Sequence, residues 1–362
     1  MHTLIFSPSR RTSLKPSRLE RLHEDGAPAG APSGARAPSA LPELVILVPP
    51  GTGGVRDYAE IMTRDIPGRI LAPVRETPLS EYGRGSIVLN FSGYGYHSRG
   101  IPGWLVERMA QLRANGMQVG IYFHELFASG PPWRSAFWLE SIQRRIAIDL
   151  GNLASYWLTN CDLSAQWLNA HCRPLPHRVL PVYSNVGELS ARPTERVDQI
   201  VVFGGTASRA QVYRRLDSGF WRWVLEEGLS VHDIGPPISS TEYERLRESQ
   251  RIHAHGSLPA EQVSERLSRA RFGLLRYEPK AAAKSGVLAA YSAHGVCPIL
   301  LADEYRTHDG LEPDRHYCSG YSGLQHGRLD ATAIGRAAFE WYQPHRTDTH
   351  VRAFRDLMGA PG

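Results

Sequence analysis

The sequence LVILVPPGTGG, residues 44–54, joins a short apolar run to a glycine loop. Five consecutive aliphatic residues ended by a proline pair indicate a strand that is buried on both faces of a parallel sheet. A helical pattern follows the loop through residue 62. The same arrangement returns as IVVFGGT at residues 200–206. Two such strand–loop–helix units, far apart in the chain, predict two doubly wound halves.

Apolar runs alternate with helical patterns around both units, which predicts parallel sheets covered by helices on both faces. We expect further strands at 86–91, 118–123, 156–158, 229–234, 272–275 and 298–301, and helices at 104–114, 135–150, 220–227, 260–270 and 286–293. Ligands of such sheets bind at the carboxyl ends of the strands. The loops that face each other between the halves therefore define a cleft.

A polar stretch at residues 188–198 marks the boundary between the halves. We expect an N-terminal Rossmann-like domain at 41–190 and a second domain of the same kind at 196–340. Residues 341–362 are expected to form a helix that packs back on the N-terminal domain. Residues 1–40 are rich in Ser, Pro, Ala, Gly and Arg, a composition typical of a disordered tail.

Composition excludes several classes of protein. The chain has 362 residues, 42% hydrophobic and 21% charged, as in globular enzymes of about two domains. Its four cysteines form no C-x-x-C pair, which argues against a zinc site or a disulfide scaffold and favours the cytoplasm. No apolar run approaches the ~20 residues that span a bilayer, although contact with the inner face of a membrane stays open.

Net charge gives little support to nucleic-acid binding. The first forty residues hold six basic and three acidic side chains, and so carry three of the five net positive charges of the chain. The remainder is nearly balanced and shows no basic stripe with interleaved aromatic residues. We expect no nucleic-acid partner.

Glycines after both strands indicate where a phosphate could bind. Gly53 and Gly54 follow the first strand, and Gly204 and Gly205 follow the second, with Thr206 and Arg209 after them. Glycine lets backbone N–H groups approach a phosphate, and a helix N-terminus adds positive potential. Each pair alone is equally consistent with a tight turn, whereas two facing pairs favour a phosphate-bearing ligand between the domains.

A histidine and two lysines add candidates. His124 ends the strand that precedes it, so it faces either the cleft or a structural hydrogen bond. Only three lysines occur among 41 basic residues, and Lys280 and Lys284 are two of them. A lysine is a compact charge suited to phosphate oxygens, although the proximity of these two is also consistent with coincidence.

Metal ligands are missing from the sequence pattern. There is no D-x-D motif and no His/Cys cluster with ligand spacing. We expect a site that needs neither a divalent metal nor a resident cofactor.

These segments together resemble the GT-B glycosyltransferases, especially the bacterial retaining enzymes labelled glycosyltransferase group 1. The likeness covers residues 44–345. It is carried by GGVRDYA at 53–59, FHEL at 123–126, HGSLP at 255–259 with LSRARFGLL at 267–275, and GVLAAYSAHGVCPI at 286–299.

The resemblance implies a metal-independent transfer of a sugar from a nucleotide-sugar donor, with retention of configuration, to a saccharide, a lipid-linked glycan or a small molecule. It implies these donor-binding residues: Gly53, Gly54, Gly204, Gly205, Thr206, Arg209, Tyr277, Glu278, Lys284, Ser285 and Gly286. The acceptor is expected near Tyr94, His97 and Glu125. His124 and Asp57 are the catalytic candidates, and either would serve as a base in an inverting variant.

One departure from the group's pattern bears on activity. The group carries two glutamates eight residues apart, and the register places Ala282 and Ala290 there. Glu278 can replace the first only with a shift of about four residues, and Lys284 with Ser285 would form a variant contact. Two alternatives therefore stay open: a GT-B-like binding or scaffold protein without activity, and a sugar-nucleotide epimerase of the same fold.

Overall fold

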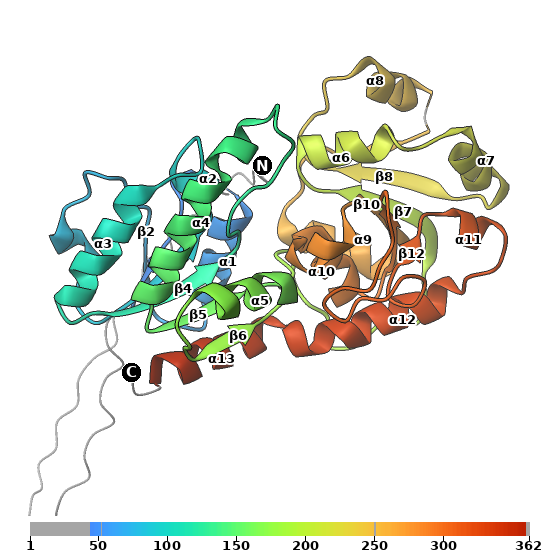
Figure 1. Ribbon diagram of the computed structural model, residues 1–362. Helices are drawn as coiled ribbons and strands as arrows, with labels where there is room; N and C mark the ends of the chain where they lie inside the picture. The colour runs from blue at the N-terminus through green and yellow to red at the C-terminus, as the bar shows by residue number, and fades with distance from the viewer. Residues whose placement is uncertain (1–43, 52, 250, 360–362) are drawn as a thin grey trace, which may run out of the picture.

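The computed structural model describes residues 44–359 except residues 52 and 250. The segment 1–40, expected to be a tail, lies outside them. The described chain forms two domains, each built on a six-stranded parallel sheet (Figure 1).

The N-terminal sheet has the strand order β2-β1-β3-β4-β5-β6, and all of its pairs are parallel. Its strands are β1 (Leu44–Leu47), β2 (Arg69–Leu71), β3 (Ser86–Phe91), β4 (Gln118–Phe123), β5 (Tyr156–Thr159) and β6 (His177–Val179). Its helices are α1 (Gly54–Met62), the 3₁₀ turn η1 (Leu79–Tyr82), α2 (Gly93–Tyr96), α3 (Gly103–Ala114), α4 (Ser135–Leu153) and α5 (Asp162–His171).

The C-terminal sheet has the order β12-β11-β10-β7-β8-β9 and is also parallel throughout. Its strands are β7 (Val197–Phe203), β8 (Ser230–Ile234), β9 (His253–Ala254), β10 (Ala270–Arg276), β11 (Cys297–Leu301) and β12 (Cys318–Ser319). Its helices are α6 (Thr206–Tyr213), α7 (Ser218–Glu226), α8 (Thr241–Glu248), α9 (Ala260–Arg269), η2 (Pro279–Lys284), α10 (Gly286–Ala293), α11 (Ser322–Gln325) and α12 (Ala331–Tyr342).

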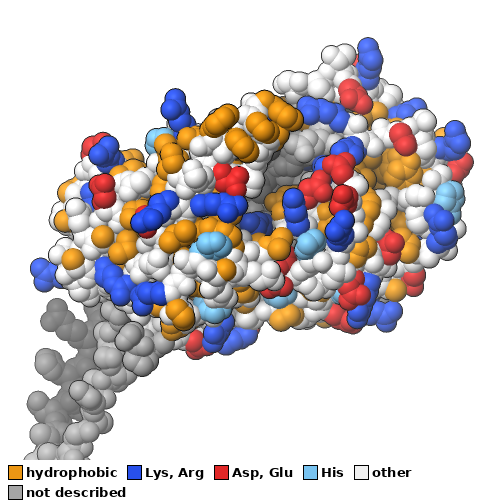
Figure 2. Space-filling model, in the orientation of Figure 1, with side chains coloured by type: hydrophobic (Ala, Val, Ile, Leu, Met, Phe, Trp, Pro, Cys, Tyr) orange, Lys and Arg blue, Asp and Glu red, His pale blue; other side chains and the backbone are white. Residues whose placement is uncertain are grey.

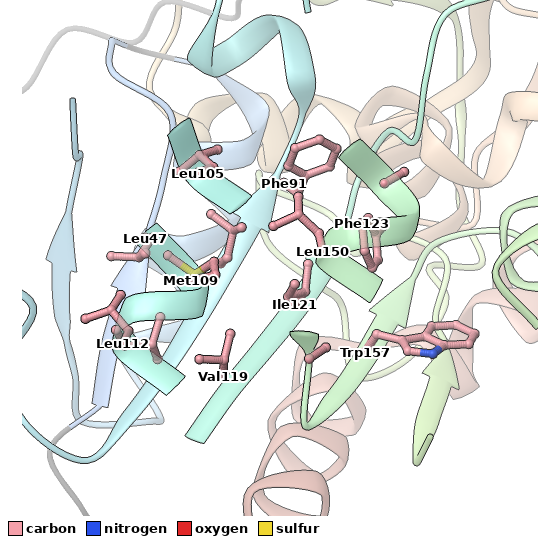
Figure 3. Packing of buried hydrophobic residues seen from close by; sticks show 14 of the residues in the cluster. Leu47, Phe91, Leu105, Met109, Leu112, Val119, Ile121, Phe123, Leu150 and Trp157 are labelled. Carbon is pink, nitrogen blue, oxygen red and sulfur yellow. The ribbon is translucent and has the colours of Figure 1, made fainter. Parts of the chain in front are cut away.

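Successive residues of the strands point to opposite faces of the N-terminal sheet and so contribute to two separate hydrophobic cores. On one face, Ile121 and Phe123 of β4 pack with Leu105 and Met109 of α3 and Leu150 of α4 (Figure 3). The opposite face is covered by α1 and by the last helix, as described next. Burial on both faces explains why these strands read as continuous apolar runs.

The chain returns to its first domain at the end. After η3 (Gln343–His345), helix α13 (Thr347–Gly359) lies against the N-terminal sheet (Figure 1). Val351, Phe354 and Leu357 of α13 share one buried cluster with Tyr122 of β4 and with Tyr58 of α1.

A carboxylate in the linker holds this return segment. Glu188 accepts hydrogen bonds from Tyr342 Oη at 2.6 Å and from the backbone N–H of Thr347 at 2.9 Å. Ser184, four residues earlier, donates its own N–H to Tyr342 Oη at 2.7 Å. The linker between the domains is therefore hydrogen-bonded directly to the segment that returns to the first domain.

None of the helices within the described residues is long and apolar enough to cross a membrane.

Candidate functional site

A cavity of about 500 Å³ lies between the two domains, where Figure 2 shows the surface hollowed. Loops at the carboxyl ends of strands from both sheets supply its walls, as doubly wound sheets require. The lining residues are Pro49, Pro50, Gly51, Gly53, Gly54, Val55, Arg56, Tyr58, Ser92, Tyr94, Gly95, His124, Glu125, Asn160, Val182, Tyr183, Asn185, Gly205, Ser208, Tyr277, Lys284, Ser285, Gly286 and Val287.

Three helix N-termini reach this cavity. Gly54 begins α1, Gly205 precedes α6, and Gly286 begins α10, and all three line the wall. The first N–H groups of a helix have no partner inside the helix, and they carry partial positive charge. Donors from both domains are therefore directed at one volume, an arrangement that favours an anion.

Glycine is required at the turn into α1. Gly53 is the N-cap residue and adopts a φ of 150°, which side chains rarely permit. Gly204, before α6, has a φ of 129°, and a Cβ there would lie 3.3 Å from the side chain of Val287. Gly204 does not line the cavity, but it lets the loop before α6 approach α10 closely.

Ser285 orients the start of α10. Its Oγ accepts a hydrogen bond from the N–H of Leu288 at 3.2 Å, as an N-cap residue does. Gly286 follows it with an open environment, since the nearest atom to a Cβ there would be Asn185 Oδ1 at 4.0 Å. This end of α10 is thus accessible to a ligand in the cavity.

Lys284 lies beside that helix end. No carboxylate among the described residues comes within 4.0 Å of its ammonium group. Lys280, one turn earlier in η2, is exposed and lines neither this cavity nor its neighbour. Lys284 therefore supplies positive charge to the cavity, and Lys280 does not.

His124 is buried and lines the cavity, with Nε2 3.0 Å from Asn90 Oδ1. Burial, and after it the charge of Lys284, lowers the pKa of His124 to about 3. The ring is therefore neutral at pH 7. Because Nε2 donates to the Asn90 oxygen, Nδ1 is left as a hydrogen-bond acceptor rather than a strong base.

Asp57 lies in the first turn of α1, but it is not among the residues that line the cavity. Burial raises its pKa to about 6, with Glu60 adding to the shift while Asn185 and Arg56 oppose it. Its Oδ2 has no hydrogen-bond partner among the described residues.

A second cavity of about 550 Å³ adjoins the first and shares Tyr94, Glu125, Tyr277 and Lys284 with it. Glu125 accepts a hydrogen bond from Ser92 Oγ at 2.8 Å. Burial, followed by the charge of Glu125, raises the pKa of Tyr277 to about 12. The shared wall thus presents a carboxylate, a neutral phenol and an ammonium group.

The other sequence candidates have partners elsewhere. Arg209 is buried; it pairs with Asp233 and donates to the carbonyl oxygens of Gly204 and Pro236. Thr206 Oγ1 donates to Pro237 O at 3.3 Å. These two residues lie near the glycine loop but not on the cavity wall.

Glu278 and His97 also lie off the wall of the first cavity. A carboxylate oxygen of Glu278 accepts from Arg276 at 2.6 Å, and His97 Nδ1 accepts the N–H of Arg99 at 3.1 Å. Ala282 and Ala290, where the group's glutamates would fall, are both buried within the core of the second domain.

Three further residues line the cavity and are not predicted from the sequence: Asn160, Asn185 and Ser208. Asn160 is buried, donates to the carbonyl of His124 at 3.1 Å, and leaves Oδ1 without a partner among the described residues. Its position directly after β5 was the available signal. No group of three or more His, Cys, Asp or Glu residues within the described chain is arranged to hold a metal ion.

No protein-family model and no curated protein matches the sequence. Solved structures do resemble the fold. An α-glucosyltransferase in complex with UDP-glucose and DNA containing an abasic site aligns with a TM-score of 0.52 at 10% identity, over 88% of this chain and 98% of that one. The chain has the GT-B fold.

A second GT-B neighbour is a mutant of TarM from S. aureus in complex with fondaparinux, α-GlcNAc-glycerol and UDP. It aligns with a TM-score of 0.50 at 9% identity and covers 76% of this chain. The present chain spans 55% of the length of that relative. At this identity the likeness concerns the GT-B architecture, with its two facing domains and the cavity between them.

Proposed function

We propose that the chain is a glycosyltransferase that takes a sugar from a nucleotide-sugar donor. One observation carries the proposal: three helix N-termini and an ammonium group converge on a cavity between the two GT-B domains, and no described carboxylate pairs with that ammonium group. A nucleoside diphosphate is the leaving group of such a donor, and it becomes more negative as the glycosidic bond breaks. Prepositioned N–H groups and a lysine stabilise that charge.

The donor diphosphate is proposed to lie against Gly54, Gly205 and Gly286, with Lys284 beside its oxygens. This placement needs no metal ion and no cofactor beyond the donor itself. Arg209 has no part in it, because it does not line the cavity and each of its three guanidinium nitrogens already donates to Asp233 or to a carbonyl oxygen.

The donor sugar is proposed to lie between His124 and Asn160. Each presents a hydrogen-bond acceptor, since Nδ1 of neutral His124 and Oδ1 of Asn160 have no partner among the described residues. Sugar hydroxyls are donors that suit both atoms. The acceptor is proposed to enter through the second cavity, between Tyr94 and Glu125.

Retention of configuration fits this geometry better than inversion. An inverting enzyme needs a base that removes the proton of the acceptor hydroxyl. His124, with a pKa of about 3, is too weak a base, and Asp57 does not line the cavity. NMR of the product's anomeric proton tests this part of the proposal: an inverted product would contradict it.

Two alternatives stay open because Ala282 and Ala290 stand where the related enzymes carry glutamates. A scaffold protein would bind no nucleotide at all. An epimerase would convert a UDP-sugar without any acceptor.

The decisive experiment is a panel of nucleoside diphosphates and nucleotide-sugars, tested for thermal stabilisation of the protein. We expect one nucleotide to raise the melting temperature, because a ligand that binds only the folded state stabilises it. The corresponding donor is then incubated alone. Slow hydrolysis supports transfer, interconversion of sugars indicates the epimerase, and no shift with any nucleotide contradicts the proposal.

A further inference from the structure

An exposed cluster of large apolar side chains lies at the start of α4. Trp133 and Trp138 are 83% and 70% exposed, and Phe137 and Ile142 are also exposed. We call these four residues the aromatic cluster. Figure 2 shows hydrophobic side chains gathered over this end of the N-terminal domain, beside the hollow between the domains. Such a concentration is costly in water unless something covers it.

Contacts hold two members of the aromatic cluster, Phe137 and Trp138, in place. The indole N–H of Trp138 donates to Pro132 O at 2.8 Å, which ties the preceding loop to the helix. The rings of Phe137 and Trp138 pack edge to face, with centroids 5.3 Å apart. Ile142 lies one turn after Trp138 on the same helix. The contacts of Phe137 and Trp138 limit the entropy that these two side chains lose when they are covered.

Charge around the aromatic cluster is positive. Arg134, beside Trp133, and Arg99, whose carbonyl accepts from Gln143 of α4 at 3.0 Å, are exposed and form no ion pair with any described residue. The neighbouring acids on α4, Glu140 and Asp149, are each paired with an arginine of the same helix. One arginine thus adjoins Trp133 in the chain and another belongs to a loop that contacts α4, and neither is paired within the described part of the chain.

We propose that the aromatic cluster docks onto the surface of an anionic lipid bilayer. Tryptophan prefers the interface between lipid and water, where its ring is buried among headgroups. Nearby arginines add attraction to anionic lipids. A protein partner would be expected to match the two arginines with acids of its own, whereas an anionic headgroup layer supplies that charge continuously.

Docking in this orientation brings the second cavity to the membrane. Gln143, one residue after Ile142, lines that cavity and accepts the N–H of Ala128 at 2.8 Å, while Phe127 forms another part of the wall. If the proposed glycosyl transfer holds, the acceptor is carried by a lipid. The docking proposal itself does not depend on that activity.

The test is co-sedimentation of the full chain with vesicles, either phosphatidylcholine alone or phosphatidylcholine mixed with phosphatidylglycerol. We expect binding to the mixed vesicles, weakened about ten-fold by Trp133→Ser or by Phe137→Ser, since each removes one large buried side chain from the bound state. Arg134→Gln should weaken binding to the mixed vesicles, and it should not change any binding to vesicles of phosphatidylcholine alone. Leu225→Ser is the matched control, because Leu225 is 80% exposed on α7 of the other domain.

Three results would overturn the proposal. One is the absence of binding to either vesicle. Another is equal binding by Trp133→Ser and Leu225→Ser, which would place the contact on a different surface. The third is a concentration-dependent dimer, seen by sedimentation velocity, that Trp133→Ser dissolves while vesicles bind nothing. Nucleotide stabilisation is measured separately, so a failure here leaves the proposed activity unaffected.

Discussion

The phenol of Tyr58 donates a hydrogen bond to Nδ1 of His350, 2.7 Å away and 292 residues later in the chain. The other ring nitrogen of His350 lies 3.0 Å from Pro181 O and donates to it. Burial lowers the pKa of His350 to about 3, so the ring is neutral at pH 7 and its Nδ1 is free to accept from Tyr58. Because Tyr58 lines the first cavity, the C-terminal helix is linked directly to a residue of the candidate site.

Buried neutral histidines predict a loss of stability in mild acid. Burial lowers the pKa of His350 to about 3, and the pKa of His124 to about 3 as well. The unfolded chain has ordinary histidines, with a pKa near 6.5, so below that pH it binds protons that the folded protein does not. As the pH is lowered from 6.5 toward 3, each of these two histidines should reduce the free energy of unfolding by up to about 1.4 kcal/mol per pH unit. Urea denaturation at pH 7, 6 and 5 measures this.

His350→Gln isolates one contribution to that slope. Glutamine offers an amide oxygen to Tyr58 but does not titrate. We expect the variant to be less stable than the parent at pH 7 and to lose less stability on acidification. An unchanged slope would mean that His350 does not stay neutral in the folded state.

Lys284→Ala should weaken nucleotide affinity or kcat/KM about ten- to a hundred-fold, because a charged hydrogen bond contributes roughly 1.5–3 kcal/mol. The melting temperature without ligand should stay within a few degrees of the parent. Lys280→Ala is the control, since that side chain is exposed and outside both cavities. If both variants match the parent in nucleotide affinity and kcat/KM, the lysine does not bind the diphosphate, and the helix N-termini bind it alone.

Arg209→Ala should destabilise the second domain without any direct role in ligand binding. Asp233 is buried beside Arg209 and also accepts hydrogen bonds from Tyr213 and Tyr243 at 2.7 and 2.6 Å. Removing one partner of a buried ion pair leaves the other uncompensated, at a cost of about 3–5 kcal/mol.

The exposed pair of Arg215 and Asp303 provides the comparison. Arg215→Ala should change the free energy of unfolding by no more than about 1 kcal/mol, as surface pairs do. Denaturant titration of both variants decides the matter, and equal effects would refute the structural role of Arg209.

Turnover of the donor should survive EDTA. Charge neutralisation is assigned to Lys284 and to backbone N–H groups, so a chelator removes nothing that the reaction uses. Assays with EDTA, and with added manganese, measure this. Loss of activity that manganese restores would show that a metal ion takes part.

The two doubly wound halves could be predicted because both faces of each sheet are covered. Continuous apolar runs such as residues 44–48 and 87–89 result from that burial and are visible without any structure. The shortest strands could not be predicted. Strands β9 and β12 have two residues each, and no periodicity can be detected over so short a span.

The candidate site was predictable only where local sequence fixes it. Glycines at strand ends and Lys284 stood out, because turn chemistry and a rare residue type are readable signals. Arg209 could not be assigned in this way. Its partner Asp233 lies on a neighbouring strand, and only the pairing of β7 with β8 brings that carboxylate close. The position of Asn160 directly after β5 is a weak signal, because an asparagine after a strand is common in ordinary loops.

The return of α13 to the first domain has a consequence for synthesis on the ribosome. The second face of the N-terminal sheet is completed by Val351 and Phe354, roughly 170 residues after β6, so at about 5–20 residues per second that face waits on the order of ten to thirty seconds for its cover. During this time Ile46 and Val88 have α1 but not α13 against them. A nascent chain of this protein therefore exposes an incompletely covered apolar sheet face until α13 emerges. Such an exposed face is a surface to which a chaperone can bind.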